Sequence, residues 1–98
     1  MDIVFADSDL AEIEGVDAGK TGFPVSVIRA VRKKLTAIRA SPDDRTLRNW
    51  KSLHYEKLKG DRAGQRSIRV NEKYRIVFTL DSETVPQKAT ILAIEDYH

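Results

Sequence analysis

The chain has 98 residues, of which 41% are hydrophobic, so it suits one domain with a single core and leaves no room for a large cofactor-binding fold. It contains no cysteine, which excludes disulfides and thiolate metal sites. The first residues lack the basic flank and apolar run of a signal peptide, and no stretch is long enough to span a membrane. We therefore expect a soluble cytoplasmic protein that forms one domain over residues 1–98.

The small net charge of +2 hides a strong asymmetry along the chain. Residues 1–19 carry six acids and no bases, residues 20–75 carry sixteen bases and five acids, and residues 76–98 carry one base and four acids. A basic block of this size favours a polyanionic partner, because binding releases the counterions condensed on the polyanion. For any single lysine or arginine, a solvated surface position is an equally good interpretation.

In the first half of the chain, a strand followed by helices is predicted. Residues 3–5 form a short apolar run, and residues 7–9 supply side-chain oxygens able to cap a short helix that Gly15 ends. Pro24 suits the first turn of a longer helix, where its missing N–H costs nothing. The apolar positions then recur at helical spacing and basic side chains fill the remaining surface, which predicts an amphipathic helix covering a sheet. These apolar positions are Val25, Ile28, Val31, Leu35 and Ile38.

A further short helix is predicted from Ser41 to near Trp50. Ser41 can cap it, Pro42 fits its first position, and the two aspartates that follow complement the positive end of the helix dipole.

After Trp50 the spacing changes from helical to alternating, which is typical of strands. A first strand is predicted around Leu53, Tyr55 and Leu58, and residues 59–64 have the glycines and aspartate of a turn. Two more strands are predicted over residues 65–70 and 73–80, joined through Asn71 and Glu72 as a tight hairpin, and a final strand over residues 88–97 follows a loop at 81–87.

Side chains alternate between the two faces of a strand, so the hairpin is predicted to have an inner and an outer face. The positions expected to face the helix are Ile68, Val70, Tyr74, Ile76, Phe78 and Leu80. Those expected to face the other way are Ser67, Arg69, Arg75, Val77 and Thr79. The predicted fold class is α+β, with helices packed on one face of a mostly antiparallel sheet.

The last three residues offer the chemistry for cleaving RNA without a metal. Such cleavage needs a base for the 2′-hydroxyl, cations for the pentavalent phosphorane and an acid for the 5′-oxygen. His98 can accept or donate a proton near neutrality, and Asp96 can orient it or act as the base. Tyr97 can stack on an unpaired base or assist proton transfer.

Basic side chains near the hairpin could hold the scissile phosphate. Arg69 and Arg75 are expected on its exposed face, and Lys59, Arg62 and Arg66 lie in or beside the preceding turn. Each of these residues also has an ordinary interpretation as a surface or packing residue. The two histidines are far apart in the sequence and no HExxH motif is present, so we expect neither a metal site nor a cofactor.

Three segments of the second half resemble the signature segments of HigB toxins, within the RelE/ParE superfamily. They read Leu-Lys-Gly-Asp-Arg-Ala-Gly-Gln-Arg-Ser-Ile-Arg-Val-Asn over 58–71, Tyr-Arg-Ile-Val-Phe over 74–78 and Glu-Asp-Tyr-His over 95–98. The first half matches mainly in its order of elements. The resemblance implies a small RelE-like fold and a toxin that enters the 30S ribosomal A site and cleaves mRNA there by attack of the 2′-hydroxyl on the adjacent phosphate.

The resemblance also implies partners and residue roles. A HigA-like helix-turn-helix antitoxin would bind the toxin in a hetero-oligomer. Lys59 and Arg75 match the phosphate-contacting positions of the family, and Asp96, Tyr97 and His98 match its catalytic tail. One departure concerns the position two residues before Leu58, where some members have a functional histidine. Here Glu56 stands at that position, and two alternatives stay open: Glu56 could act as a base, or His54, two residues upstream, could move into the role through a bulge.

Further basic side chains are expected to contact RNA or the ribosome: Arg29, Arg32, Lys33, Arg62, Arg66, Arg69 and Lys73. Two other functions stay open. A ParE-like gyrase poison would share the architecture without a proton-transfer tail, and a non-catalytic module would bind RNA or an antitoxin without cleaving. In a regular last strand, Asp96 and His98 share one face and Tyr97 points to the other.

Overall fold

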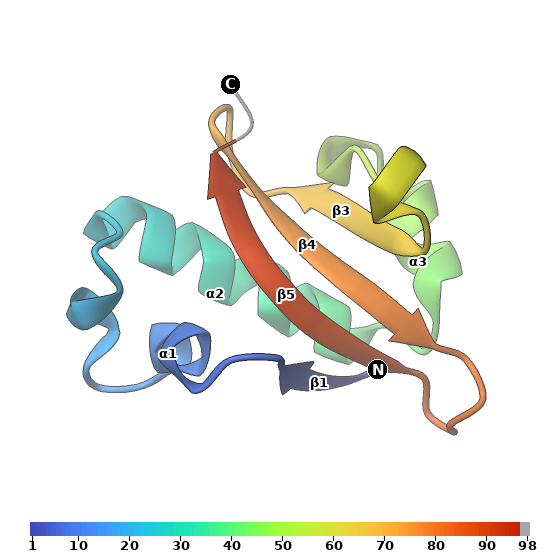
Figure 1. Cartoon of the computed structure of the whole chain (residues 1–98), viewed down its shortest axis with the longest axis horizontal. Helices are drawn as coiled ribbons and strands as arrows, with labels where there is room; N and C mark the ends of the chain where they lie inside the picture. Colours follow the sequence, from blue (N-terminus) through green and yellow to red (C-terminus); the bar gives the residue numbers. More distant parts are fainter. Residues whose placement is uncertain (97–98) are drawn as a thin grey trace.

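The structure is a computed structural model, and it describes residues 1–96. Five strands and three α-helices are joined by short 3-10 turns (Figure 1). The strands are β1 (Asp2–Phe5), β2 (Glu56–Lys57), β3 (Gln65–Arg69), β4 (Tyr74–Asp81) and β5 (Lys88–Asp96). The α-helices are α1 (Ser8–Ala11), α2 (Val25–Ala40) and α3 (Asp44–Asn49). The 3-10 turns are η1 (Glu12–Glu14), η2 (Ala18–Thr21), η3 (Lys51–Leu53) and η4 (Gly60–Arg62).

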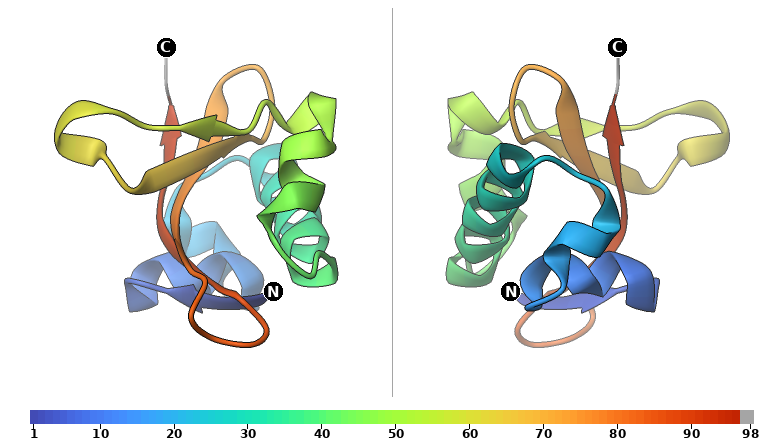
Figure 2. Two further views of the ribbon diagram at one scale, coloured as in Figure 1. Left: turned by 90° about the vertical axis from the view of Figure 1, so that its right-hand side faces the viewer. Right: turned by 90° about the vertical axis from the view of Figure 1, so that its left-hand side faces the viewer.

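The sheet has the order β1-β5-β4-β3-β2. β1 runs parallel to β5, and every other neighbouring pair is antiparallel. Both α2 and α3 lie on the same side of this sheet (Figure 2). The predicted α+β class, with helices on one face of a mostly antiparallel sheet, is therefore confirmed. No helix within residues 1–96 is long and apolar enough to cross a membrane.

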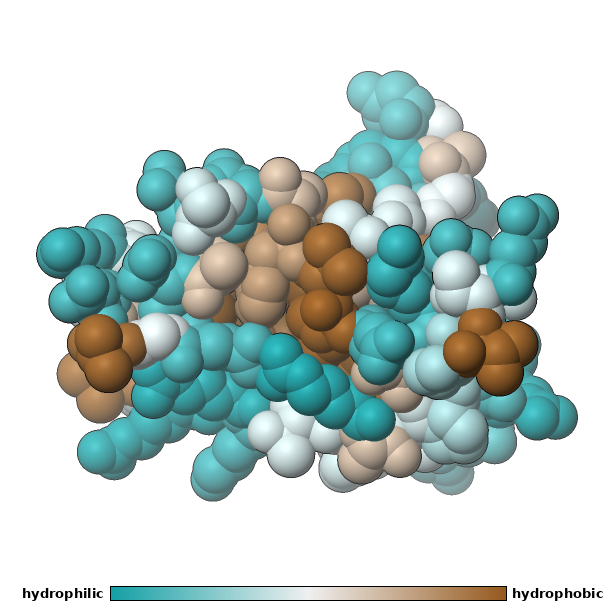
Figure 3. Space-filling view, turned by 90° about the horizontal axis from the view of Figure 1, so that it is seen from below, coloured by the Kyte–Doolittle hydropathy of each residue, from teal (hydrophilic) through white to brown (hydrophobic). Residues whose placement is uncertain are grey.

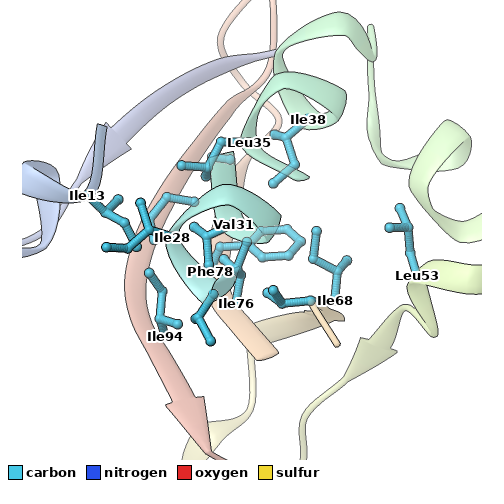
Figure 4. Close-up of a cluster of buried hydrophobic side chains, with 14 of the residues drawn as sticks. Ile13, Ile28, Val31, Leu35, Ile38, Leu53, Ile68, Ile76, Phe78 and Ile94 are labelled. Carbon is cyan, nitrogen blue, oxygen red and sulfur yellow. The ribbon is translucent and has the colours of Figure 1, made fainter. Parts of the chain in front are cut away.

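One hydrophobic core lies between α2 and the sheet (Figure 4). The helix buries one stripe of side chains, because apolar residues three and four positions apart share a helix face. Val31, Leu35 and Ile38 on this stripe are fully buried, as are Ile76 and Phe78 on β4. Each such side chain contributes roughly 1.5–3 kcal/mol to folding through removal from water.

The predicted alternation in β3 and β4 is confirmed. Ile68 pairs with Ile76 and both belong to the core, whereas Arg69 pairs with Arg75 in the next row. β5 departs from simple alternation at Leu92, since Val77 is opposite Ala93 and Phe78 is opposite Ile91. Leu92 is thus the extra residue of a β-bulge, which restores Ile94 to the core side.

Three local predictions were wrong in detail. Asp43 caps α3 through the Arg45 N–H, while Ser41 ends α2 and donates its hydroxyl to the Ala37 carbonyl. The strand predicted around residues 53–58 is reduced to the two residues of β2, because η3 occupies residues 51–53 and His54 is left-handed. The β3–β4 connection is wider than a two-residue turn, since the Asn71 side chain accepts hydrogen bonds from the backbone of both Lys73 and Tyr74.

The hairpin formed by β2, η4 and β3 projects from the sheet on the side away from α2 (Figure 2). Ser67 and Val77 point to this uncovered side, yet they are only 1% and 2% exposed. The middle of the outer face of the sheet is therefore enclosed at Ser67 and Val77.

Candidate functional site

A row of charged side chains crosses the outer face of the sheet. Arg69 on β3 stands opposite Arg75 on β4, and Arg75 stands opposite Glu95 on β5. Like charges directly opposite each other destabilise a sheet unless other groups compensate. Here the compensating groups are the His54 carbonyl before β2, the Glu56 carboxylate on β2 and the Ser67 hydroxyl on β3, while Arg62 of η4 pairs with Glu95.

Arg75 is held by several polar contacts on this face. Its Nη1 donates hydrogen bonds to the His54 carbonyl oxygen at 3.0 Å and to the Ser67 hydroxyl at 2.9 Å. The same nitrogen lies 3.6 Å from a carboxylate oxygen of Glu56, and the side chain is only 14% exposed. Arg75 lies on the predicted outer face, but its side chain is mostly enclosed there. The guanidinium is fixed in one orientation, which suits a cation that must meet charge developing in a transition state.

His54 connects both arginines. It is the only non-glycine residue with positive φ among the described residues, at φ 46 and ψ 51, in the left-handed region. This conformation ends η3 and turns the carbonyl toward Arg75. The imidazole Nε2 lies 3.4 Å from Arg69 Nη1, and Arg69 Nε donates to the Asn71 carbonyl at 3.1 Å. His54 and Glu56 are thus both brought beside the arginine row.

Arg62 connects η4 to β5 through a hydrogen bond to Glu95. Its Nη2 donates to a Glu95 carboxylate oxygen at 2.7 Å, and its Nε donates to the Gln65 side chain at 3.3 Å. The charge of Arg62 is therefore paired within the fold. Lys59, directly before η4, is exposed, and no ion pair or hydrogen bond joins its side chain to another residue within 1–96.

Arg66 does not belong to the arginine row. It pairs with Phe78, a core residue, and so points to the face that carries α2. Its Nη1 donates to the Gly64 carbonyl at 3.1 Å. Nearby, Tyr55 donates its hydroxyl to Asp44 at 3.1 Å. Burial raises the pKa of Tyr55 to about 12; the charge of Arg66 acts against this shift, and the hydrogen bond to Asp44 adds to it. Tyr55 is therefore no candidate for a base near neutrality.

Asp96 lies at the end of β5 and on the opposite face from Arg75. It is paired with Tyr74, which packs against the core, and its carboxylate is 3.6 Å from Lys73 Nζ. The β3–β4 loop and this end of β5 lie together at one end of the sheet (Figure 1). Tyr97 and His98, the other two residues of the predicted tail, lie outside the described residues.

The basic residues of α2 are separate from this site, because α2 covers the other face of the sheet (Figure 2). Arg29 and Lys33 are exposed there. Arg32 instead links α2 to the end of η1, since its Nε and Nη2 donate hydrogen bonds to the carbonyls of Ile13 and Gly15, each at 2.8 Å. The structure therefore divides the predicted basic residues into two groups on opposite sides.

Ser67 is the residue that sequence reasoning missed. Alternation placed it on the outer face, but nothing in the sequence indicated that its hydroxyl would meet Arg75 from a strand position eight residues away. A small polar residue in the middle of a strand is the only available signal. Within the described residues, no group of three or more histidine, aspartate or glutamate side chains is arranged to hold a metal ion.

The fold of this chain is similar to that of several solved toxin structures. The chain is similar to a YoeB/ParE toxin from Agrobacterium tumefaciens, with a TM-score of 0.61, 17% identity and full coverage of both chains. It is similar to a chain of the YoeB–YefM toxin–antitoxin complex from Staphylococcus aureus, with a TM-score of 0.61, 21% identity and coverage of 100% and 97%. The RelBE2 toxin–antitoxin complex from Mycobacterium tuberculosis gives a TM-score of 0.56, 17% identity and coverage of 97% and 95%. At these identities the likeness shows the fold alone.

Sequence comparison gives the family. No curated protein sequence matches the chain significantly. The sequence profile of the HigB-like toxins, described as RelE-like toxins of the type II toxin–antitoxin system HigB, matches residues 4–98. The predicted resemblance is confirmed: this chain belongs to the HigB-like toxin family, the RelE-like toxins of type II toxin–antitoxin systems.

Proposed function

We propose that this toxin is a metal-independent endoribonuclease that cleaves mRNA in the ribosomal A site and so inhibits translation in the cytoplasm. The observation that carries the proposal is the immobilised Arg75, held by His54, Glu56 and Ser67 near the end of the sheet where the Asp96-Tyr97-His98 segment begins. Family membership supports the same activity.

In the proposed reaction the 2′-oxygen attacks the adjacent phosphorus and the bond from phosphorus to the 5′-oxygen breaks. The products are a 2′,3′-cyclic phosphate and a 5′-hydroxyl. A base removes the proton of the 2′-hydroxyl and an acid returns a proton to the 5′-oxygen. His98 and Asp96 take these two roles from the end of β5, so the RNA has to pass around this end of the sheet, because Asp96 lies on the face opposite Arg75. Tyr97 stacks on or hydrogen-bonds to the nucleotide.

The charge that develops on the phosphorane is met by Arg75 and Lys59. Arg75 supplies a planar donor that needs no reorganisation, because its hydrogen bonds are already made. Lys59 supplies an exposed cation from the projecting hairpin. Arg69 and Lys73 extend the cationic surface along the RNA, with Arg29 and Lys33 on α2 contacting the ribosome.

A HigA-like helix-turn-helix antitoxin is the proposed partner of the resting toxin, in a hetero-oligomer. The support is the family, whose members belong to toxin–antitoxin systems.

The test is brief induction of the toxin followed by mapping of mRNA 5′ ends, with and without treatment by polynucleotide kinase. We expect ends that fall in phase with codons and can be ligated only after the kinase has phosphorylated their 5′-hydroxyls. The His98→Ala and Asp96→Asn variants should lose these ends and relieve growth arrest, whereas Thr84→Ala in the exposed loop before β5 should keep both.

Growth arrest with intact mRNA and double-strand DNA breaks would contradict the proposal and indicate a gyrase poison. RNA binding that weakens steeply with salt, without cleavage in a translating extract, would indicate a non-catalytic module instead.

A further inference from the structure

The outer edge of β5 is covered by β1 along only half of its length. β1 pairs with Lys88–Ile91 and ends at Phe5, and the last bond on this edge joins the Ala6 N–H to the Ile91 carbonyl at 2.9 Å. β5 continues to Asp96. Among the described residues, no strand pairs with residues 92–96 on the side away from β4. An unpaired edge of this kind is a template for an added strand.

The backbone of Ile94 points to this open edge. The Tyr74 carbonyl accepts a hydrogen bond from the Val70 N–H, so the backbone N–H and C=O groups of Tyr74 point to β3. Backbone groups two residues apart on a strand point to the same side, so those of Ile76 also point to β3 and not to β5. Ile76 is opposite Ile94. Ile76 and Ile94 therefore form a non-hydrogen-bonded pair, in which the N–H and C=O groups of each residue point away from the other strand. The N–H and C=O groups of Ile94 therefore face away from β4, toward the part of the β5 edge that β1 does not cover.

An open pocket of about 720 Å³ lies directly against this edge. Its apolar lining comes from Leu92, Ala93 and Ile94 on β5 and from Leu10 and Phe23 across from them. Phe23 is fixed by an edge-on contact with Tyr74, with ring centroids 5.5 Å apart. The side of the molecule that carries β1 and α1 is mostly hydrophilic and has an apolar area near its middle (Figure 3).

The remaining lining of the pocket is strongly acidic. Asp7, Asp9, Glu12 and Asp17 line it, against one cation, Lys20, which lies 3.7 Å from Asp17. All four carboxylate residues are exposed. A field of this sign repels a polyanion and attracts lysine or arginine side chains. The pocket thus has the opposite charge to the arginine row, and none of His54, Glu56 and Arg75 lines it.

We propose that the open edge of β5 and this pocket, together called the β5 edge site, bind an extended basic segment of a partner polypeptide. The segment continues the sheet beyond β1 and pairs its main chain with Ile94. Alternate side chains of an added strand point to opposite faces, so one row packs on the apolar lining and the other presents its cations to the carboxylates. The main-chain hydrogen bonds provide affinity and the acidic rim provides specificity. This site is independent of the proposed nuclease activity.

The test uses a blocked peptide of alternating lysine and valine as the probe, added to the full isotope-labelled chain and followed by NMR. We expect the amide signals of residues 92–94 to shift and exchange of the Ile94 N–H with solvent to slow. The Asp9→Asn/Glu12→Gln double variant should bind the peptide about tenfold more weakly, as expected for two lost charge interactions. Glu83→Gln, which removes an acid outside the pocket, should bind as the unaltered chain does.

Two matched peptides separate strand pairing from attraction between charges. A counterpart in which glutamate replaces lysine should not bind, and a peptide N-methylated at alternate residues should lose binding although its charge is kept. If the double variant fails to fold, these peptides give the same test on the unaltered chain. Unchanged exchange at Ile94, equal binding of the N-methylated peptide, or self-association of the chain through this edge that the peptide cannot displace would overturn the proposal.

Discussion

The Ser67 hydroxyl accepts a hydrogen bond from Arg75 Nη1 at 2.9 Å, and Ser67 is only 1% exposed. A hydrogen bond to a charged group contributes about 1.5 kcal/mol, and one that fixes a transition-state cation is worth about tenfold in rate. Ser67→Ala should therefore lower mRNA cleavage about tenfold at equal protein level, measured by quantifying cleaved ends. Ser52→Ala, on the exposed surface of η3, serves as the control. Full activity of Ser67→Ala would show that Arg75 needs no such support.

Glu56 and His54 are alternatives for the upstream role, and the structure gives them different contacts with Arg75. The Glu56 carboxylate lies 3.6 Å from Nη1, whereas His54 uses its backbone carbonyl. Because His54→Ala keeps that carbonyl, we expect cleavage to fall less than tenfold in this variant. Glu56→Gln removes the negative charge and should reduce cleavage more strongly if Glu56 is a base. A larger loss in His54→Ala would assign the role to the imidazole, and pH profiles of both variants provide the check.

Arg69 is predicted to contact an RNA phosphate. Removal of one phosphate-contacting cation lowers the salt dependence of binding, so Arg69→Ala should reduce the slope of log affinity against log salt by about 1. Arg48→Ala is the matched control, because Arg48 lies 3.6 Å from Asp44 on α3 and away from the outer face. Binding titrations of a single-stranded RNA at several salt concentrations measure both slopes, and equal slopes would remove Arg69 from the RNA-binding surface.

Tyr55 is predicted to make the stability of the fold depend on pH in the alkaline range. Its pKa is raised from 10.0 to about 12, first by burial and then by the hydrogen bond to Asp44, so the folded state favours the neutral phenol. The stabilisation is complete below pH 10 and is lost as the pH rises toward 12. Tyr55→Phe should show a smaller decline of the unfolding free energy over this range in urea titrations. Identical declines in the two proteins would contradict the assignment.

Arg32 is expected to stabilise the fold and not to bind RNA. Its two hydrogen bonds to the Ile13 and Gly15 carbonyls attach η1 to α2. Arg32→Ala should lower the unfolding free energy by about 1 kcal/mol, since the partly buried bond to the Ile13 carbonyl is lost, whereas the exposed Gly15 carbonyl can bind water instead. Lys33→Ala, one residue away and exposed, should change it by less than about 0.5 kcal/mol. Thermal unfolding of both variants gives the comparison.

The sequence by itself was sufficient for the features that depend on near neighbours. Helical spacing placed α2, and alternation assigned Arg69 and Arg75 to the face opposite Ile68 and Ile76, because a period of two is a local property of a strand. Local capping was less secure: Asp43 caps α3, whereas the Ser41 hydroxyl donates to the Ala37 carbonyl at the end of α2.

Only the tertiary structure decided how the candidate site is assembled. The hydrogen bond from Arg75 to the His54 carbonyl joins residues 21 positions apart. It depends on the left-handed backbone conformation of His54, which no sequence pattern predicted. The end of β1 at Phe5 leaves the β5 edge site uncovered, and this depends on pairing between strands at opposite ends of the chain. Residue types and strand faces could therefore be predicted from neighbouring residues, whereas the partners of each charge depended on long-range packing.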